Sequence, residues 1–261
     1  MAGIFGFFDY SKPGKGVYKN EPKRSRFAHF WVLLGRKFWQ LVQVNMLYVI
    51  FCIPIVTIGP ATAGLVYILR QFANERPVFL VSDFWDNFRQ NWKQSFVFSL
   101  IQAAFIFLMS TSFQFYFYNA REHTWMYALL GLCVVISLLG LFASFYVYLM
   151  IVTLDLKLFA IVKNAFIFAV LCLKTNFITL LFVMLSFGLT VLFWPVTVIL
   201  VICINLALAG FIICYNSYQY IHKYAVEPYL ESLREQEGPS AQDDPEEGVF
   251  SDEIKKFNDR D

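Results

Sequence analysis

Residues 51–71 read FCIPIVTIGPATAGLVYILRQ. One apolar run stops at Gly59-Pro60, and a second apolar run then continues to Arg70. Apolar runs joined by a glycine–proline turn are typical of a tight hairpin inside a lipid bilayer. We therefore predict an all-α, polytopic helical membrane protein.

The composition agrees with a membrane protein, because 58% of the residues are hydrophobic and only 15% are charged. Soluble domains usually carry about 25% charged residues. Residues 227–261 hold 4 basic and 12 acidic residues, whereas the rest of the chain holds 17 and 7. We predict a basic cytoplasmic arm (1–26), a helical membrane domain (27–220) and an acidic, largely disordered cytoplasmic tail (221–261). The polar start predicts no secretory signal peptide.

The first hairpin is predicted in three parts. A crossing from Phe38 to Ile58 is kinked at Pro54, because proline removes a backbone donor. Gly59-Pro60 makes the turn, and Ala61–Ala73 runs back. That return segment is short for a hydrocarbon core of about 30 Å, so it either crosses with distortion of the bilayer or is re-entrant. Arg70 is expected to extend to the membrane interface.

Four more crossings are predicted, for about six in three hairpins. Their ranges are 96–118, 124–152, 177–193 and 196–217, with a turn at Trp194-Pro195 between the last two. Three further segments are expected to lie along the membrane surface: residues 27–37, an amphipathic helix through Ser95 with Ser82 as its N-cap, and residues 155–176.

The distribution of basic residues favours six crossings over five. Six crossings place both termini and almost every Lys and Arg on the cytoplasmic side, whereas five place two basic groups outside. Arg121 is then the basic residue of the outer loops. We therefore expect a multi-pass protein of the bacterial plasma membrane with both termini in the cytoplasm.

Several short motifs support a resemblance to a known family. They are Phe8-Asp9-Tyr10, residues 12–17 (KPGKGV), residues 59–64 (GPATAG), Asp83-Phe84-Trp85 and residues 91–94 (NWKQ). In these motifs the chain resembles the YesL-like family of bacterial integral membrane proteins, a domain of unknown function. The resemblance covers most of residues 1–220 and excludes the acidic tail. It implies a role near carbohydrate uptake, since members tend to be encoded beside ATP-binding-cassette sugar importers. It implies no catalytic residue.

Two groups of residues are candidates for contact with a partner. In the first, small residues permit close helix packing, and the same residues could contact a partner or line a ligand path; these are Gly59, Pro60, Ala61, Thr62 and Gly64. In the second, polar side chains share one face of the predicted amphipathic helix, which is either a docking face or a solvated one; these are Asp86, Arg89, Gln90 and Lys93.

The sequence offers no recognisable catalytic, cofactor or metal site. No phosphate-binding loop, nucleophile elbow or zinc-protease motif is present, and the three histidines are far apart in sequence. The amides Asn45, Gln102, Gln114 and Asn205 are expected to form hydrogen bonds between helices. The five cysteines are expected to be buried and unpaired.

These observations favour a non-enzymatic accessory subunit of a carbohydrate importer of the ATP-binding-cassette type. Its expected partners are the bilayer and other membrane subunits, such as the sugar permease. No nucleic-acid partner is expected, and the sequence identifies no small-molecule ligand. Two alternatives stay open: a transporter or channel in its own right, and a scaffold or sensor that uses the acidic tail.

Overall fold

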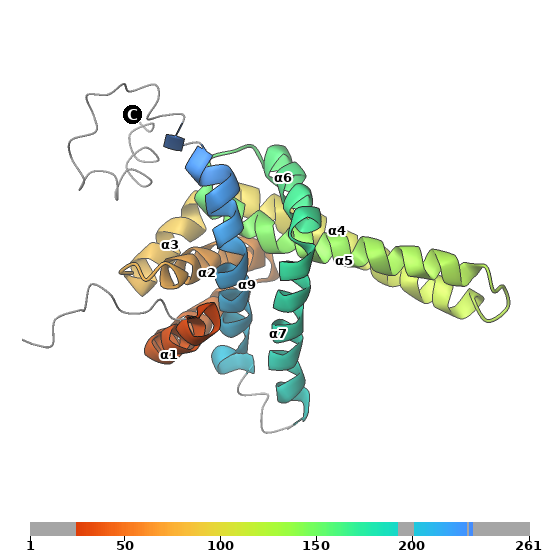
Figure 1. The fold of residues 1–261 in the computed structure, drawn as a ribbon, viewed down its shortest axis with the longest axis horizontal. Helices are drawn as coiled ribbons and strands as arrows, with labels where there is room; N and C mark the ends of the chain where they lie inside the picture. Colours follow the sequence, from red (N-terminus) through yellow and green to blue (C-terminus); the bar gives the residue numbers. More distant parts are fainter. Residues whose placement is uncertain (1–24, 193–200, 229, 232–261) are drawn as a thin grey trace, which may run out of the picture. The chain divides into compact units, whose positions relative to one another are not determined.

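The computed structural model describes residues 25–192, 201–228 and 230–231, and within them the chain forms helices and no strands (Figure 1). Residues 1–36 and 37–261 form two separate compact units. The elements, of which η1 is a 3-10 turn and η2 and η3 are π-helical, are α1 (Arg26–Phe51), η1 (Ile55–Thr57), α2 (Ile58–Ala73), α3 (Leu80–Gln90), α4 (Trp92–Asn119), α5 (Met126–Thr153), α6 (Leu158–Leu171), α7 (Leu173–Leu192), η2 (Val201–Asn205), α9 (Leu206–Ile221) and η3 (His222–Val226).

Four segments among the described residues are long and apolar enough to cross a membrane. They are Ile55–Ala73, Trp92–Asn119, Met126–Thr153 and Leu173–Leu192. The first is 67% buried inside the protein, whereas the second is only 6% buried. The prediction of a helical chain is therefore confirmed in the described residues, as is the presence of helices long and apolar enough to cross a membrane. Helix α2 is the most buried of these segments.

The position predicted for the first turn is wrong. The chain leaves α1 after Phe51, and Gly59 and Pro60 lie in the first turn of α2. Pro54 ends the helix instead of kinking it, and the Thr57 hydroxyl then donates to the carbonyls of Phe51 and Pro54 at 2.6 Å each. Pro60 is tolerated because the first backbone N–H groups of a helix have no partner within it.

Several predicted boundaries also differ. The segment 27–37 is not a separate surface helix, because α1 is continuous from Arg26. The segment 155–176 is divided between α6 and α7, which meet at Cys172. The last predicted crossing contains the π-helical turn η2 before α9 begins at Leu206. The predicted turn at Trp194-Pro195, the basic arm and most of the acidic tail lie outside the described residues.

The predicted amphipathic helix is a helix, but it is shorter and more enclosed than expected. Ser82 does not cap it, since α3 begins at Leu80 and the Phe79 N–H donates to Asp83 Oδ2 at 2.9 Å. Its aromatic face packs on protein: the Phe51 ring lies 5.3 Å from Phe84 and 5.2 Å from Phe88 between centroids. The chain then breaks at residue 91, where α4 starts in a new direction.

Candidate functional site

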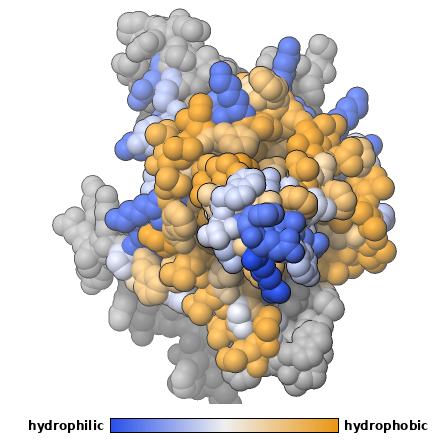
Figure 2. All heavy atoms as spheres, turned by 90° about the vertical axis from the view of Figure 1, so that its right-hand side faces the viewer, coloured by the Kyte–Doolittle hydropathy of each residue, from blue (hydrophilic) through white to orange (hydrophobic). Residues whose placement is uncertain are grey.

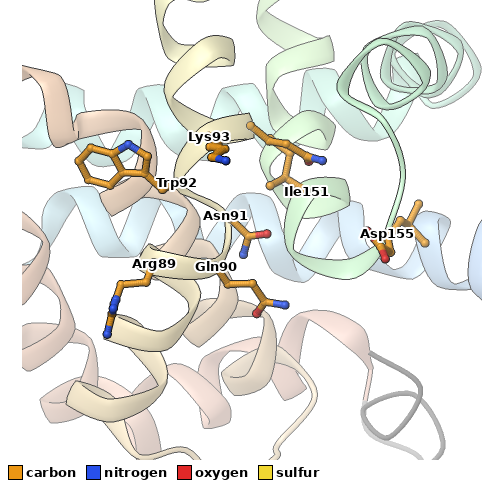
Figure 3. A pocket seen from close by; sticks show the side chains of 9 residues that line it. Arg89, Gln90, Asn91, Trp92, Lys93, Ile151 and Asp155 are labelled. Atoms are coloured by element: carbon orange, nitrogen blue, oxygen red, sulfur yellow. The ribbon is translucent and has the colours of Figure 1, made fainter. Parts of the chain in front are cut away.

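An open depression of about 650 Å³ lies where the break between α3 and α4 meets the end of α5 (Figure 3). One wall comes from residues 89–94 and the other from the last turn of α5 and the extended segment after it. The lining residues are Arg89, Gln90, Asn91, Trp92, Lys93, Gln94, Ile151, Leu154 and Asp155.

Buried amides build the break that shapes this depression. The Asn91 side chain donates to the Asn87 carbonyl at 3.2 Å, and the Asn87 side chain donates to the Asp83 carbonyl at 2.9 Å. Each amide thus bonds to the carbonyl four residues earlier, and the Asn87 carbonyl also accepts the Asn91 backbone N–H at 3.1 Å, so both buried amides have a partner. Gln94 Nε2 donates to the Leu156 carbonyl at 3.1 Å and so ties the two walls together. The depression is thus held by side chains rather than by loop packing alone.

The rim of the depression carries charges of both signs. Arg89 and Lys93 are exposed on the wall from α3 and α4, and Asp155 is exposed on the opposite wall. The Arg89 guanidinium lies 5.8 Å from the centre of the Trp85 ring, which restricts its position. Within the described ranges, no ion pair involves these three groups. They are therefore available to a polar or charged partner.

Three of the four residues predicted for a docking face line this depression. Arg89, Gln90 and Lys93 surround the break, whereas Asp86 is exposed one turn earlier on α3. The 3.6-residue period placed them on one face, but it could not show that the end of α5 forms the other wall. Asp155 was missed as a member of the site for the same reason.

The small residues of α2 lie inside the protein. Gly59, Pro60, Ala61 and Gly64 are buried, and Thr62 is half-buried. A Cβ atom on Gly64 would lie 2.9 Å from the Phe84 carbonyl oxygen, and one on Gly59 would overlap Ser95 and Ser99. These residues thus allow α2 to approach α3 and α4 closely. Thr62 Oγ1 lies 3.2 Å from Tyr48 Oη of α1.

Arg70 does not extend to the membrane interface as predicted, because its side chain is buried, with 9% exposure. Its Nη1 donates to Thr153 Oγ1 at 3.0 Å and to the Val152 carbonyl at 3.4 Å. The rings of Tyr67 and Tyr218 lie 5.1 and 5.8 Å from the guanidinium carbon. The C-terminal carbonyls of α5 favour a cation there. The contact with Tyr67 could have been expected from the sequence, because residues three apart are neighbours on a helix. The contact with Tyr218 could not, because it joins two distant helices.

A row of polar contacts joins α7 to α9. Asn205 accepts a hydrogen bond from the Ser186 hydroxyl and donates to Thr190 Oγ1 at 3.2 Å. Further along, Asn216 Nδ2 donates to Thr179 Oγ1 at 3.1 Å. Finally, the hydroxyls of Thr175 and Tyr220 lie 2.7 Å apart. These contacts, together called the α7–α9 polar row, occur at intervals along most of α7.

The predicted interhelical hydrogen bonds form for two of the four amides. Asn205 binds α7, and Asn45 Oδ1 accepts from the backbone N–H of Ala207 at 2.7 Å. Gln102 is half-exposed and Gln114 is exposed, and neither forms a hydrogen bond in the described part of the chain. The structure therefore shows no interhelical bond of these two amides among the described residues, where Gln114 lies on an exposed face of α4.

The described residues contain no group of three or more His, Cys, Asp or Glu side chains that could hold a metal ion. Cys133, Cys172 and Cys214 are buried, while Cys52 and Cys203 are half-buried. No residue pair of the depression combines a nucleophile with a general base, since its ionisable members are Arg89, Lys93 and Asp155. The chemistry offered by this site is recognition of charged and polar groups.

Comparison with known proteins gives one match. No curated protein and no solved structure matches the chain. The matched segment is residues 41–113, which contains the end of α1, all of α2 and α3, and most of α4. It therefore includes the wall of the depression that carries Arg89 and Lys93. Over that segment, the chain is similar to the family described as "Protein of unknown function, DUF624".

Proposed function

We propose that this protein is a non-enzymatic accessory subunit of an ATP-binding-cassette carbohydrate importer, and that it holds an importer subunit at the depression beside the α3–α4 break. The proposal that a partner docks here rests on the exposed charges on both walls of the depression, which form no ion pair among the described residues. The depression is open and has a volume of about 650 Å³. That the partner is a carbohydrate importer is inferred from the resemblance to the YesL-like family.

The chemistry of the depression suits a protein segment with charges of both signs. Arg89 and Lys93 would bind carboxylates, and Asp155 across the depression would bind a basic residue. Gln90 is exposed at the rim and offers an amide that can donate and accept. Such paired recognition fixes the orientation of a docked helix or loop as well as its affinity.

The proposed setting is the bacterial plasma membrane, with six crossings and both termini in the cytoplasm. This arrangement puts the depression on the cytoplasmic side, together with most of the exposed basic residues. The α4–α5 turn would then face outward. The break at residues 52–57 lies beside α3 and the start of α4, so it would stay on the side of the depression, as in a re-entrant first hairpin. A docking site on the inner face can contact both a permease and its ATPase subunits.

The test is affinity purification from native membranes in mild detergent, with mass spectrometry of the proteins that stay bound. We expect importer subunits with the wild-type protein and at least a tenfold loss with the double variant Arg89→Glu and Lys93→Glu. Lys163→Glu with Lys223→Glu is the matched control, because both lysines are exposed and outside the depression. Recovery of no importer subunit, or equal loss in both double variants, contradicts the proposal.

A second candidate function is transport by this protein itself, and the α7–α9 polar row favours it. Hydroxyl and amide groups recur along that helix pair, and a π-helical turn precedes Leu206, which is a frequent feature of functional sites. Sugar flux into liposomes that contain only this protein would support transport. Asn216→Leu should then reduce the flux, whereas the Arg89 and Lys93 variants should not.

A further inference from the structure

Helix α4 presents two faces, each lined by side chains about one or two helical turns apart. In the described chain, only one of these faces packs on α5. The first face packs on α5: the Phe98 ring lies 5.1 Å from the Tyr148 ring, Phe105 fills the space at Gly140, and Cys133 Sγ lies 3.8 Å from the Met109 carbonyl. Phe98, Phe105 and Met109 are separated by seven and four residues, which are whole numbers of helical turns to within a few tens of degrees. That spacing is the pattern of helices that pack nearly parallel.

The other face also advances by steps of three and four residues, and in the described chain it is exposed, apart from contacts of Phe117 with neighbours in sequence. We call it the outer seam; it consists of Leu100, Ala103, Phe107, Ser110, Gln114 and Phe117, and all six are exposed. The exposed fractions of Leu100, Phe107 and Phe117 are 62%, 72% and 46%. At about 1.5 Å per residue, the seam is roughly 26 Å long. It therefore runs along most of a bilayer core.

Apolar side chains on the outer seam could simply face lipid, but Gln114 is different. It is exposed, and no hydrogen bond satisfies its amide in the described residues. Lipid tails offer neither donors nor acceptors, so an amide on a lipid-facing surface favours contact with another helix. Ser110, one turn earlier, adds a small residue that lets a second helix approach closely.

The end of the hairpin carries complementary charges. Arg121 and Glu122 are both exposed, and neither forms an ion pair within the described ranges. The Arg121 guanidinium lies 5.8 Å from the Phe117 ring, at the end of the outer seam. Figure 2, which faces the end of the hairpin, shows a hydrophilic patch surrounded by hydrophobic side chains. A two-fold axis beside this end would bring Arg121 of one copy to Glu122 of another.

We propose that the outer seam is a homodimer interface inside the membrane. Two copies inserted with the same orientation are related by a two-fold axis along the membrane normal, so their α4 helices are parallel and their Gln114 side chains lie at equal depth. An amide is complementary to itself, because each one donates and accepts. The steps of three and four residues suit a shallow left-handed crossing of about 20°. Phe107 and Phe117 together offer on the order of 200 Å² of area from each copy.

Disulfide cross-linking in native membranes tests this geometry. The background protein lacks Cys52, Cys133, Cys172, Cys203 and Cys214, all of which are unpaired in the structure. In that background we expect Ser110→Cys to form a dimer of twice the mass on mild oxidation. Leu108→Cys is the matched control: it is 57% exposed on the same helix but is rotated about 120° from the seam. Equal cross-linking at both positions, no cross-linking, or an adduct with a different protein overturns the proposal.

A second measurement keeps the inference independent of cysteine chemistry. Gln114→Leu should weaken dimerisation in detergent or lipid by about 3- to 15-fold, the range expected for loss of hydrogen bonding between membrane helices. Gln102→Leu removes an amide that is rotated by about 120° from Gln114 on α4 and should leave the dissociation constant unchanged. An unchanged constant for Gln114→Leu, or an equal rise for both variants, contradicts a role for Gln114 in the interface.

Discussion

Gly64 of α2 illustrates how one residue sets the distance between two helices. A Cβ at this position would lie 2.9 Å from the Phe84 carbonyl oxygen and 3.2 Å from the Phe84 ring. Backbone atoms cannot move aside without shifting α3, so the absence of a side chain is required there. Gly131 of α5, by contrast, has no atom within 4 Å of where its Cβ would be.

We therefore expect opposite effects from two chemically identical substitutions. Gly64→Ala should lower the free energy of unfolding by about 1–3 kcal/mol through overpacking. Gly131→Ala should leave it unchanged or raise it by up to about 1 kcal/mol, because alanine favours a helix. Thermal unfolding in detergent measures both variants. Similar melting temperatures for the two proteins would show that α2 and α3 are not packed as closely as described.

At the scale of elements, the attachment of α3 depends on the end of α1. The Phe51 ring contacts three aromatic rings of α3, with centroid distances of 5.3, 5.7 and 5.2 Å to Phe84, Trp85 and Phe88. Stacked and tilted ring pairs add to the burial of their area. Phe51 thus fastens α3 against the bundle and helps to position the break that shapes the depression.

Phe51→Ala should loosen α3 and lower the free energy of unfolding by about 1–3 kcal/mol, less than for a fully buried phenylalanine, because Phe51 is half-buried. Because α3 would separate more often, trypsin should cleave faster after Arg89 and Lys93. Phe79→Ala serves as the control, since Phe79 is 79% exposed just before the same helix. The cleavage rates are measured by mass spectrometry. Equal rates in both variants would mean that Phe51 does not hold α3.

The sequence predicted the elements better than their junctions. The apolar runs from residue 96 to 118 and from 124 to 152 correspond closely to α4 and α5, because a long hydrophobic helix needs no partner to be recognised. The first turn was predicted at Gly59-Pro60 but lies near Pro54. There the Thr57 hydroxyl donates to the carbonyls of Phe51 and Pro54, a contact that the sequence pattern does not reveal. The second wall of the depression depends on Gln94 binding Leu156 across 62 residues, which no periodicity reveals.

At the scale of the whole molecule, the proposed six-crossing arrangement makes a prediction about access. A cysteine at Glu122, in the α4–α5 turn, should react with a membrane-impermeant maleimide in intact cells. Cys52, which follows Phe51 beside α3, and a cysteine at Lys93 should both react only after permeabilisation. Burial raises the pKa of the Cys52 thiol, so its labelling should be slow at neutral pH and accelerate as the pH rises. Labelling at Lys93 in intact cells would contradict the arrangement.

The buried Arg70 has a consequence for how the protein is made. Its contacts are Thr153 and Tyr218, which follow it by 83 and 148 residues. At about 5–20 residues per second, roughly 7 to 30 s of synthesis separate Arg70 from Tyr218. During that interval the Arg70 guanidinium lacks both contacts, so it has to extend from the last turn of α2 to the membrane interface. The final packing of α2 should therefore form only after α9 has been made, and nascent chains that end before α9 should leave α2 accessible to protease.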